Sequence, residues 1–154
     1  MRSWAQDRGF TLLEMVATMA IMTILAGAAL PLAQEHAQRM KEVELRRDLR
    51  EIRTAIDRYK DFSDRGLIPV ETDTYGYPPT LETLVRGVPL KGDPDLRYRF
   101  LRKIPVDPMT GNTDWGLRSM QDDPDTQTWG GQNVFDVYDN SGGTALDGTQ
   151  YSSW

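Results

Sequence analysis

The sequence predicts an α+β fold in which one long N-terminal helix packs on a small antiparallel β-sheet. An apolar run, residues 10–33, is followed by residues 34–62, which have the periodicity of an amphipathic helix. Residues 63–154 then alternate short strand-like stretches with turns rich in glycine and aspartate. With 154 residues and a mass of 17.5 kDa, the chain has room for one domain and one appendage.

Composition excludes several kinds of function. The 18 Lys and Arg residues against 23 Asp and Glu residues give a net charge of -5, and no long basic run occurs, so nucleic-acid binding is not expected. The lack of cysteine excludes disulfides, thiolate metal sites and cysteine nucleophiles. The single histidine, His36, leaves no pair for a histidine-based zinc site.

Residues 10–33 are long enough to cross a membrane as one helix. At 1.5 Å per residue the segment would extend roughly 36 Å, against about 30 Å for a hydrocarbon core. Its one charged residue is Glu14. A carboxylate costs roughly 2.5 to 3.5 kcal/mol at the middle of a membrane, so such a residue normally has a partner or a function.

The residues around this glutamate form a recognisable motif, because residues 8–14 read RGFTLLE. The motif resembles the class III signal of type IV pilins and type II secretion pseudopilins. The resemblance implies that a prepilin peptidase removes a leader, residues 1–9, by cutting between Gly9 and Phe10, and that Phe10 is then N-methylated. The cut keeps the apolar helix, which can serve first as a membrane anchor and later as the core of a filament.

Phe10 and Glu14 form the predicted assembly site. The α-amino group of Phe10 has an ordinary pKa near 8 and is a cation at neutral pH, and a buried carboxylate needs a cation. Within one straight helix the two residues lie about 6 Å apart along the axis. We therefore expect Glu14 to pair with the Phe10 amine of a neighbouring subunit, as the resemblance also implies.

A kink or loosening of the helix is expected between Gly27 and Pro31. Proline removes one helical hydrogen bond and clashes with the preceding turn. The alternative is that Pro31 marks the membrane end of the helix.

The charge pattern and the resemblance disagree about orientation. The leader contains Arg2 and Arg8, whereas six basic residues fall within the 20 residues after Ala33. Counted alone, these charges place the C-terminal side of the apolar segment in the cytoplasm. The resemblance implies a single-pass protein of the bacterial inner membrane with its C-terminal domain in the periplasm, and we adopt that orientation.

Residues 34–62 should continue the same helix with one apolar face. The opposite side carries acid–base pairs at i,i+4 spacing, such as Arg53 with Asp57. Joined to the apolar run, the segment gives a helix of roughly 50 residues. The apolar face, expected to pack on a sheet, consists of Leu45, Leu49, Ile52, Ile56 and Tyr59.

A second resemblance lies in the globular part. Thr80 is a candidate N-cap for a short helix through Arg86, ended by Gly87. Residues 77–84, YPPTLETL, and 101–108, LRKIPVDP, are similar to the pattern of G-type major pseudopilins. Residues 115–119 and 134–138 read as short strands. The terminal Tyr151 and Trp154 either pack back on the sheet or contact neighbouring subunits.

The C-terminal acids raise the question of calcium. Major pseudopilins of this type commonly hold calcium in a C-terminal loop, and the resemblance makes Asp139, Asn140 and Asp147 candidate ligands. The loop of this chain, residues 143–148, is shorter than that of the family. The alternative is that these residues only form turns beside glycine.

The resemblance implies a structural subunit without catalysis of its own, which polymerises through its N-terminal helix into a periplasmic pseudopilus that drives type II protein secretion. Its expected partners are other copies of the chain, minor pseudopilins, the prepilin peptidase, and an inner-membrane assembly platform with its ATPase. Membrane lipid surrounds the helix before assembly. A separate ATPase is required because the chain has no Walker A sequence.

Other functions stay open. The chain can be the subunit of a longer type IV pilus, although it lacks the cysteine pair common in such subunits. It can also be a membrane-anchored enzyme or periplasmic binding module, in which carboxylates such as Asp107 and Asp136 do acid–base chemistry. Acids in Asp-Pro settings are usually turn residues, which disfavours the enzyme. Glu14 disfavours a minor pseudopilin of the filament tip.

Overall fold

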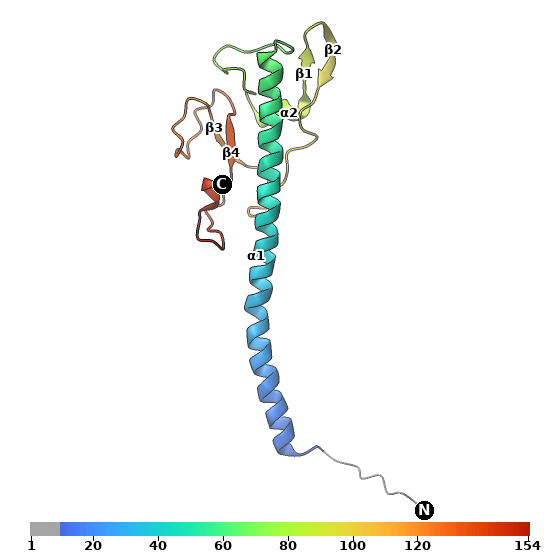
Figure 1. The fold of residues 1–154 in the computed structure, drawn as a ribbon, viewed down its shortest axis with the longest axis vertical. Helices are drawn as coiled ribbons and strands as arrows, with labels where there is room; N and C mark the ends of the chain where they lie inside the picture. The colour runs from blue at the N-terminus through green and yellow to red at the C-terminus, as the bar shows by residue number, and fades with distance from the viewer. Residues whose placement is uncertain (1–9) are drawn as a thin grey trace, which may run out of the picture. The chain divides into compact units, whose positions relative to one another are not determined.

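A computed structural model describes residues 10–154, and the side chains of these residues except 28–32 and 94. The chain divides into two compact units that meet between Gln38 and Arg39. The elements, in chain order, are α1 (Leu12–Asp64), α2 (Leu81–Arg86), β1 (Val88–Leu90), β2 (Asp93–Tyr98), β3 (Gly116–Arg118), β4 (Asp136–Tyr138) and the 3-10 helix η1 (Tyr151–Ser153) (Figure 1).

Helix α1 begins at a polar cap. The Thr11 hydroxyl accepts a hydrogen bond from the Glu14 backbone N–H at 3.2 Å, and the Met15 N–H donates to the Thr11 carbonyl at 3.1 Å. A threonine hydroxyl at this position satisfies a backbone donor that has no partner inside the helix. The Thr18 and Thr23 hydroxyls donate to carbonyls of the preceding turn, so their polar groups are also satisfied within the helix.

The first part of α1 carries its apolar side chains on the outside. The large apolar residues between Phe10 and Leu25 are all exposed, from 51% at Met15 to 85% at Leu12. The helix runs without interruption through Gly27 and Pro31, and a kink there stays a prediction. Among the described residues, no helix combines the length and the apolarity that a membrane crossing requires.

In the second unit, residues 39–154, the later turns of α1 form one wall of the core. The predicted apolar face is confirmed, since its members and Ala55 are buried. The same cluster contains Leu84 of α2, Val88 of β1 and Val137 of β4. The ring centroid of Phe62 in α1 lies 4.6 Å from that of Tyr98 in β2 and 5.2 Å from that of Phe100, so aromatic packing contributes to holding the β1–β2 hairpin on the helix.

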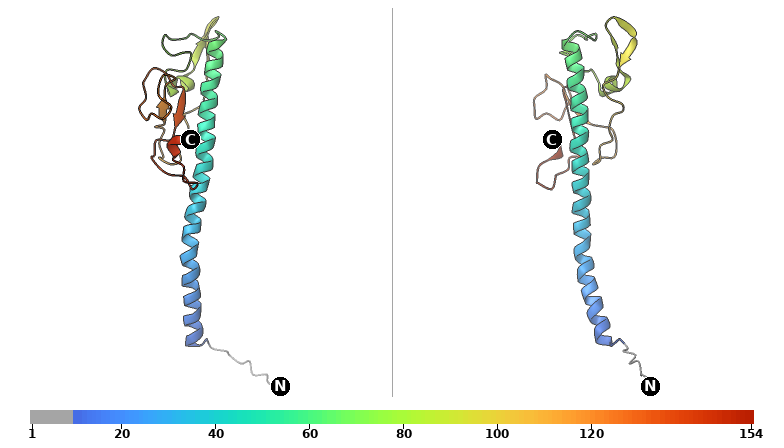
Figure 2. Two further views of the ribbon diagram at one scale, coloured as in Figure 1. Left: turned by 60° about the vertical axis from the view of Figure 1, so that its left-hand side comes forward. Right: turned by 45° about the vertical axis from the view of Figure 1, so that its right-hand side comes forward.

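The sheet consists of two separate antiparallel pairs, β1 with β2 and β3 with β4. Figures 1 and 2 show β1–β2 beside the last turns of α1, and β3–β4 beside an earlier stretch of the same helix. In the second pair Gly116 lies opposite Tyr138 and Arg118 opposite Asp136. Both strands of this pair lie within the predicted ranges, whereas the β1–β2 hairpin was not predicted.

The short helix α2 forms as the sequence predicts. Thr80 is its N-cap, and the Thr80 hydroxyl accepts from the Thr83 N–H at 3.4 Å. Gly87 ends the helix at φ 77°, and a Cβ atom there would lie 2.7 Å from the Tyr98 carbonyl oxygen. Glycine is therefore required at this position, both for the left-handed backbone and for the close approach of β2.

Arg53 joins the C-terminal segment to α1. Its Nε donates to Asp136 Oδ1 at 2.7 Å, and its Nη2 donates to the carbonyl oxygens of Val137 at 2.9 Å and Trp154 at 2.5 Å. The expected pairing of Arg53 with Asp57 is therefore wrong, because the planar guanidinium reaches three acceptors across the domain that a helical neighbour does not offer.

The last residues pack back on the helix. Tyr151 is buried, and its hydroxyl donates to Glu42 Oε1 at 3.0 Å. The Arg46 guanidinium lies over the Trp154 ring, 3.7 Å from the ring centroid. Tyr151 and Trp154 thus pack within the chain, with α1 as a partner that the expected packing on the sheet did not include.

We expect Arg53→Lys to loosen the C-terminal segment. Lysine keeps the charge but has one nitrogen in place of the fork, so the loss of bonds to Val137 and Trp154 should cost about 1–3 kcal/mol. Limited digestion by carboxypeptidase should then release C-terminal residues faster. The exposed Arg50→Lys is the matched control, and equal digestion of the two variants would contradict the assigned role.

The loop between β3 and β4 is held by Asp122. Its Oδ2 accepts from the backbone N–H of Ser119 at 2.7 Å and of Gly130 at 3.0 Å. These bonds, that of Ser119 first, lower the pKa of Asp122.

Stability should depend on the ionisation of Asp122. Because its pKa in the folded chain lies below the unfolded value of about 3.9, the carboxylate stabilises the fold above that value. The contribution disappears as the pH falls through the lowered pKa. Asp122→Ala should therefore reduce the melting temperature at neutral pH and leave it unchanged near pH 2, as measured by differential scanning fluorimetry. The exposed Asp123→Ala should have no effect at either pH.

Candidate assembly site

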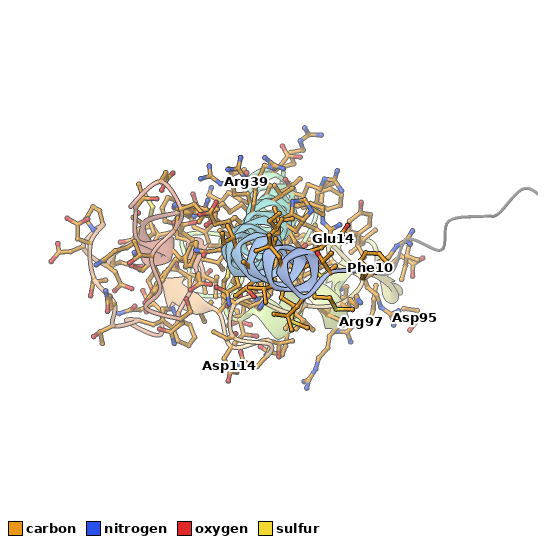
Figure 3. All side chains as sticks on the ribbon, turned by 90° about the horizontal axis from the view of Figure 1, so that it is seen from below. Phe10, Glu14, Arg39, Asp95, Arg97 and Asp114 are labelled. Atoms are coloured by element: carbon orange, nitrogen blue, oxygen red, sulfur yellow. The ribbon has the colours of Figure 1, made fainter. Side chains whose placement is uncertain are left out.

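Phe10 and Glu14 lie together at the start of α1, as Figure 3 shows. Phe10 precedes the Thr11 cap and is 74% exposed, and Glu14 is exposed in the first turn of the helix. Within residues 10–154, the Glu14 carboxylate has no hydrogen bond or ion pair. An acidic residue in the first turn interacts favourably with the positive end of the helix dipole.

The arrangement combines an exposed apolar surface with one carboxylate at its end. Exposed apolar surface on this scale marks a contact with a partner protein or a membrane. When such a surface becomes covered, the carboxylate loses water and requires a cation. The site is therefore suited to association with an apolar partner, and Glu14 requires that this partner supply a cation.

The three candidate calcium ligands differ in their burial and in their hydrogen bonds. Asp147 is exposed, and its Oδ1 accepts from the Thr149 N–H at 2.9 Å and the Thr149 hydroxyl at 2.6 Å. These bonds, that of the hydroxyl first, lower the pKa of Asp147, and Arg46 contributes from 3.7 Å. Asn140 is exposed, whereas Asp139 is buried. Asp147 is thus held as a turn residue by Thr149, and calcium binding by the three candidates stays a prediction.

The carboxylates of the enzyme alternative also serve different purposes. Asp136 lies between two arginines, with Arg53 Nε at 2.7 Å and Arg118 Nη1 at 3.7 Å. Asp107 is fully buried. The two do not form an acid–base pair open to a substrate, and among the described residues no group of three acidic or histidine side chains is placed to hold a metal.

Sequence reasoning missed the proximity of Asp107 and Asp139. Both are 0% exposed, although 32 positions separate them in the chain. Burial raises the pKa of Asp139, and the neighbouring Asp107 carboxyl raises it further. Each aspartate precedes turn residues, which is the usual setting of a surface aspartate, so the local sequence gives no indication that they face one another.

Comparison with known proteins identifies the family. Residues 4–30 match the prokaryotic N-terminal methylation motif, a segment that includes Gly9, Phe10 and Glu14. The type II secretion system core protein G of Pseudomonas aeruginosa PAO1 is 31% identical over 110 residues, which cover 67% of this chain and 68% of that protein. The chain belongs to this pseudopilin family.

A second relative of the pseudopilin is a pilin. The type IV major pilin protein PilA of Myxococcus xanthus DK1622 is 36% identical over 80 residues, which cover 47% of this chain and 36% of the pilin. The pseudopilin thus spans little more than a third of that protein's length. No solved structure matches the chain. The predicted type IV pilin-like α+β fold is confirmed, with its long N-terminal helix and small antiparallel sheets.

The processing site of the pseudopilin stays a prediction. Residues 1–9, including Gly9, lie outside the described residues. The match to the methylation motif supports Phe10 as the methylated residue, and cleavage between Gly9 and Phe10 is the reaction that would expose its amine.

Proposed function

We propose that the chain is a structural subunit that is anchored in the bacterial inner membrane by residues 10–33 and polymerises through them into a periplasmic pseudopilus that drives type II protein secretion. One observation carries the proposal. The start of α1 presents an exposed apolar surface with one carboxylate, that of Glu14, which has no partner within residues 10–154, and this surface lies inside a matched methylation motif.

The energetics explain why one helix serves in both places. In the membrane, lipid covers the apolar side chains. When the helix moves from lipid into a filament of sister helices, it therefore gains little hydrophobic free energy, and packing between helices must hold the filament together. In water the same side chains would each cost about 1.5–3 kcal/mol. A subunit in the filament is therefore retained there, and extraction from lipid requires work from outside the chain.

Glu14 supplies the register between subunits. When neighbouring helices cover it, the carboxylate must be paired, and the α-amino group of a neighbour's Phe10 is a cation of the right size at the matching position. A subunit displaced along the filament by a different step would leave both charges buried without a partner. The pair thus favours one axial displacement over others.

Several partners follow from this assignment. A prepilin peptidase removes the leader, an inner-membrane assembly platform with an ATPase supplies the work, and minor pseudopilins accompany the major subunit in the filament. The globular part faces the periplasm. The chain itself is not assigned an enzymatic activity, in keeping with relatives whose names describe a secretion-system core protein and a pilin.

A longer type IV pilus is the second candidate, and the identity to the Myxococcus pilin favours it. The longer alignment with the secretion protein and the lack of a cysteine pair favour the pseudopilus. Deletion of the gene in its own bacterium separates the two. We expect proteins to disappear from the culture supernatant while surface pili persist, whereas loss of surface pili with normal export would establish the alternative.

Gly9→Ala should block processing. The unprocessed precursor should accumulate in the membrane, because the peptidase requires the small residue before the cut. Intact-mass spectrometry of membrane-extracted protein measures this directly, since the wild type should lack residues 1–9 and carry one methyl group. Ser3→Ala in the same leader is the control. Normal processing of Gly9→Ala would show that the cut is elsewhere.

Glu14→Ala should be inserted and processed but assemble poorly. Without the carboxylate, the neighbour's amine would be buried unpaired, which typically costs 3–5 kcal/mol for a broken buried pair. The yield of sheared or cross-linked filament should fall at least tenfold. Glu35→Ala changes an exposed glutamate of the same helix and should assemble normally. A wild-type yield from Glu14→Ala would remove the pairing from the mechanism.

A further inference from the structure

A groove beside the later turns of α1 is lined by arginine side chains. It has a volume of about 570 Å³ and lies between α1 and residues 100–102, and a second hollow of about 340 Å³ continues it past Arg99. The floor of the groove is apolar, because Ala55, Phe100 and Leu101 are buried. The charged residues of this arginine groove are Arg47, Arg50, Glu51, Arg58, Arg99 and Arg102.

Most of these arginines have no counterion within the chain. Among residues 10–154, Arg47 has ion pairs with Glu44 at 3.5 Å and Asp48 at 3.1 Å. Guanidinium groups bind carboxylates through two parallel hydrogen bonds, and a groove with an apolar floor also has a place for an apolar side chain between such carboxylates. The groove is therefore suited to an acidic segment of a protein. The groove arginines without an ion pair in the described part of the chain are Arg50, Arg58, Arg99 and Arg102.

A turn in the loop between β3 and β4 has the matching chemistry. The Thr126 N–H donates to the Asp123 carbonyl at 3.0 Å, which closes a turn with Pro124 at its second position. Asp123, Pro124 and Asp125 are all exposed. This acidic turn, residues 123–126, thus presents two carboxylates on either side of one apolar ring.

The arginine groove and the acidic turn lie on different sides of the same helix. Figures 1 and 2 show the chain that follows β2 on one side of α1 and the loop between β3 and β4 on another. On α1, Arg53 binds Asp136 of β4, whereas Thr54, turned by about 100° from it, lines the groove. Within residues 10–154 no ion pair joins the two surfaces, and residues 119–154 contain no lysine or arginine that could neutralise the turn.

We propose that the acidic turn of one subunit binds in the arginine groove of the next subunit of the filament. Pro124 would lie on the apolar floor, and Asp123 and Asp125 would pair with the arginines of the walls. Both surfaces belong to one chain, so each added copy presents the same unoccupied surface again, and a contact of this head-to-tail kind extends into a filament. The contact rests on the proposed function, since it needs a polymer of the chain, and it adds an electrostatic contact between globular parts to that of the N-terminal helices.

The lack of native cysteine allows a direct test of the contact. Thr54→Cys and Gln127→Cys place one thiol in the groove and one beside the acidic turn of the full chain, both at exposed positions. In assembled filaments, a short thiol-reactive crosslinker should join the double variant into a ladder of dimers and longer species on a denaturing gel. Each single variant should stay monomeric. Thr113→Cys combined with Thr54→Cys is the matched control and should give no ladder.

The crosslinking result separates this contact from the proposed function. Filaments of the double variant that form without a ladder would overturn the contact and leave polymerisation standing. If the wild-type chain forms no filament, the proposed function is wrong and the contact is overturned with it.

Charge reversal tests the same contact without cysteine. Arg58→Glu and Asp125→Arg should each reduce the yield of sheared filament about fivefold or more, because like charges then meet. Combined in one chain, the two substitutions restore opposite charges, and the yield should return to within about twofold of the wild type. Arg86→Glu changes an exposed arginine outside the groove and should assemble normally.

Near-UV circular dichroism of the full chain in detergent checks that each charge-reversal variant is folded. Wild-type yields from both single variants would overturn the proposal. A loss in the folded single variants that the combined variant does not recover would also overturn it, because the groove would then bind an anion other than the acidic turn.

Discussion

The fold depends on how one helix divides its apolar surface. The face of α1 that passes through Ile52 is buried within the globular part, whereas the side chains between Phe10 and Leu25 find no cover among their own unit. Exposure of this apolar surface to water costs free energy, so the helix is stable only in an environment that covers the surface. Lipid and sister helices are the two environments that the proposed function supplies in turn.

The globular part is small, and its stability depends on a few side chains that each make several contacts. A single guanidinium, that of Arg53, holds Asp136 and two backbone carbonyls, so strand β4 and the chain's last residue share one anchor on α1. The two hairpins do not pair with each other, and each is held by the helix. The helix is thus the organising element of the domain, and the strands are attached to it.

Local patterns were readable from the sequence, and contacts between distant segments were not. The face around Ile52, the helix between Thr80 and Gly87, and the strand at residues 136–138 follow from periodicity, capping and turn residues, all of which are local. The β1–β2 hairpin was missed because prolines and acids in it disfavour strands. The pairing of Asp107 with Asp139 depends on how the whole domain closes.

The Thr11 hydroxyl that caps α1 has a consequence for maturation. Thr11 is the second residue after the proposed cut, so hydrolysis of the Gly9–Phe10 bond does not remove the hydroxyl that caps the helix. Precursor and product then share the same first turn. The peptidase can therefore cleave the chain without unfolding the start of α1. The position of the new α-amino group of Phe10 is then fixed by the first turn of the helix.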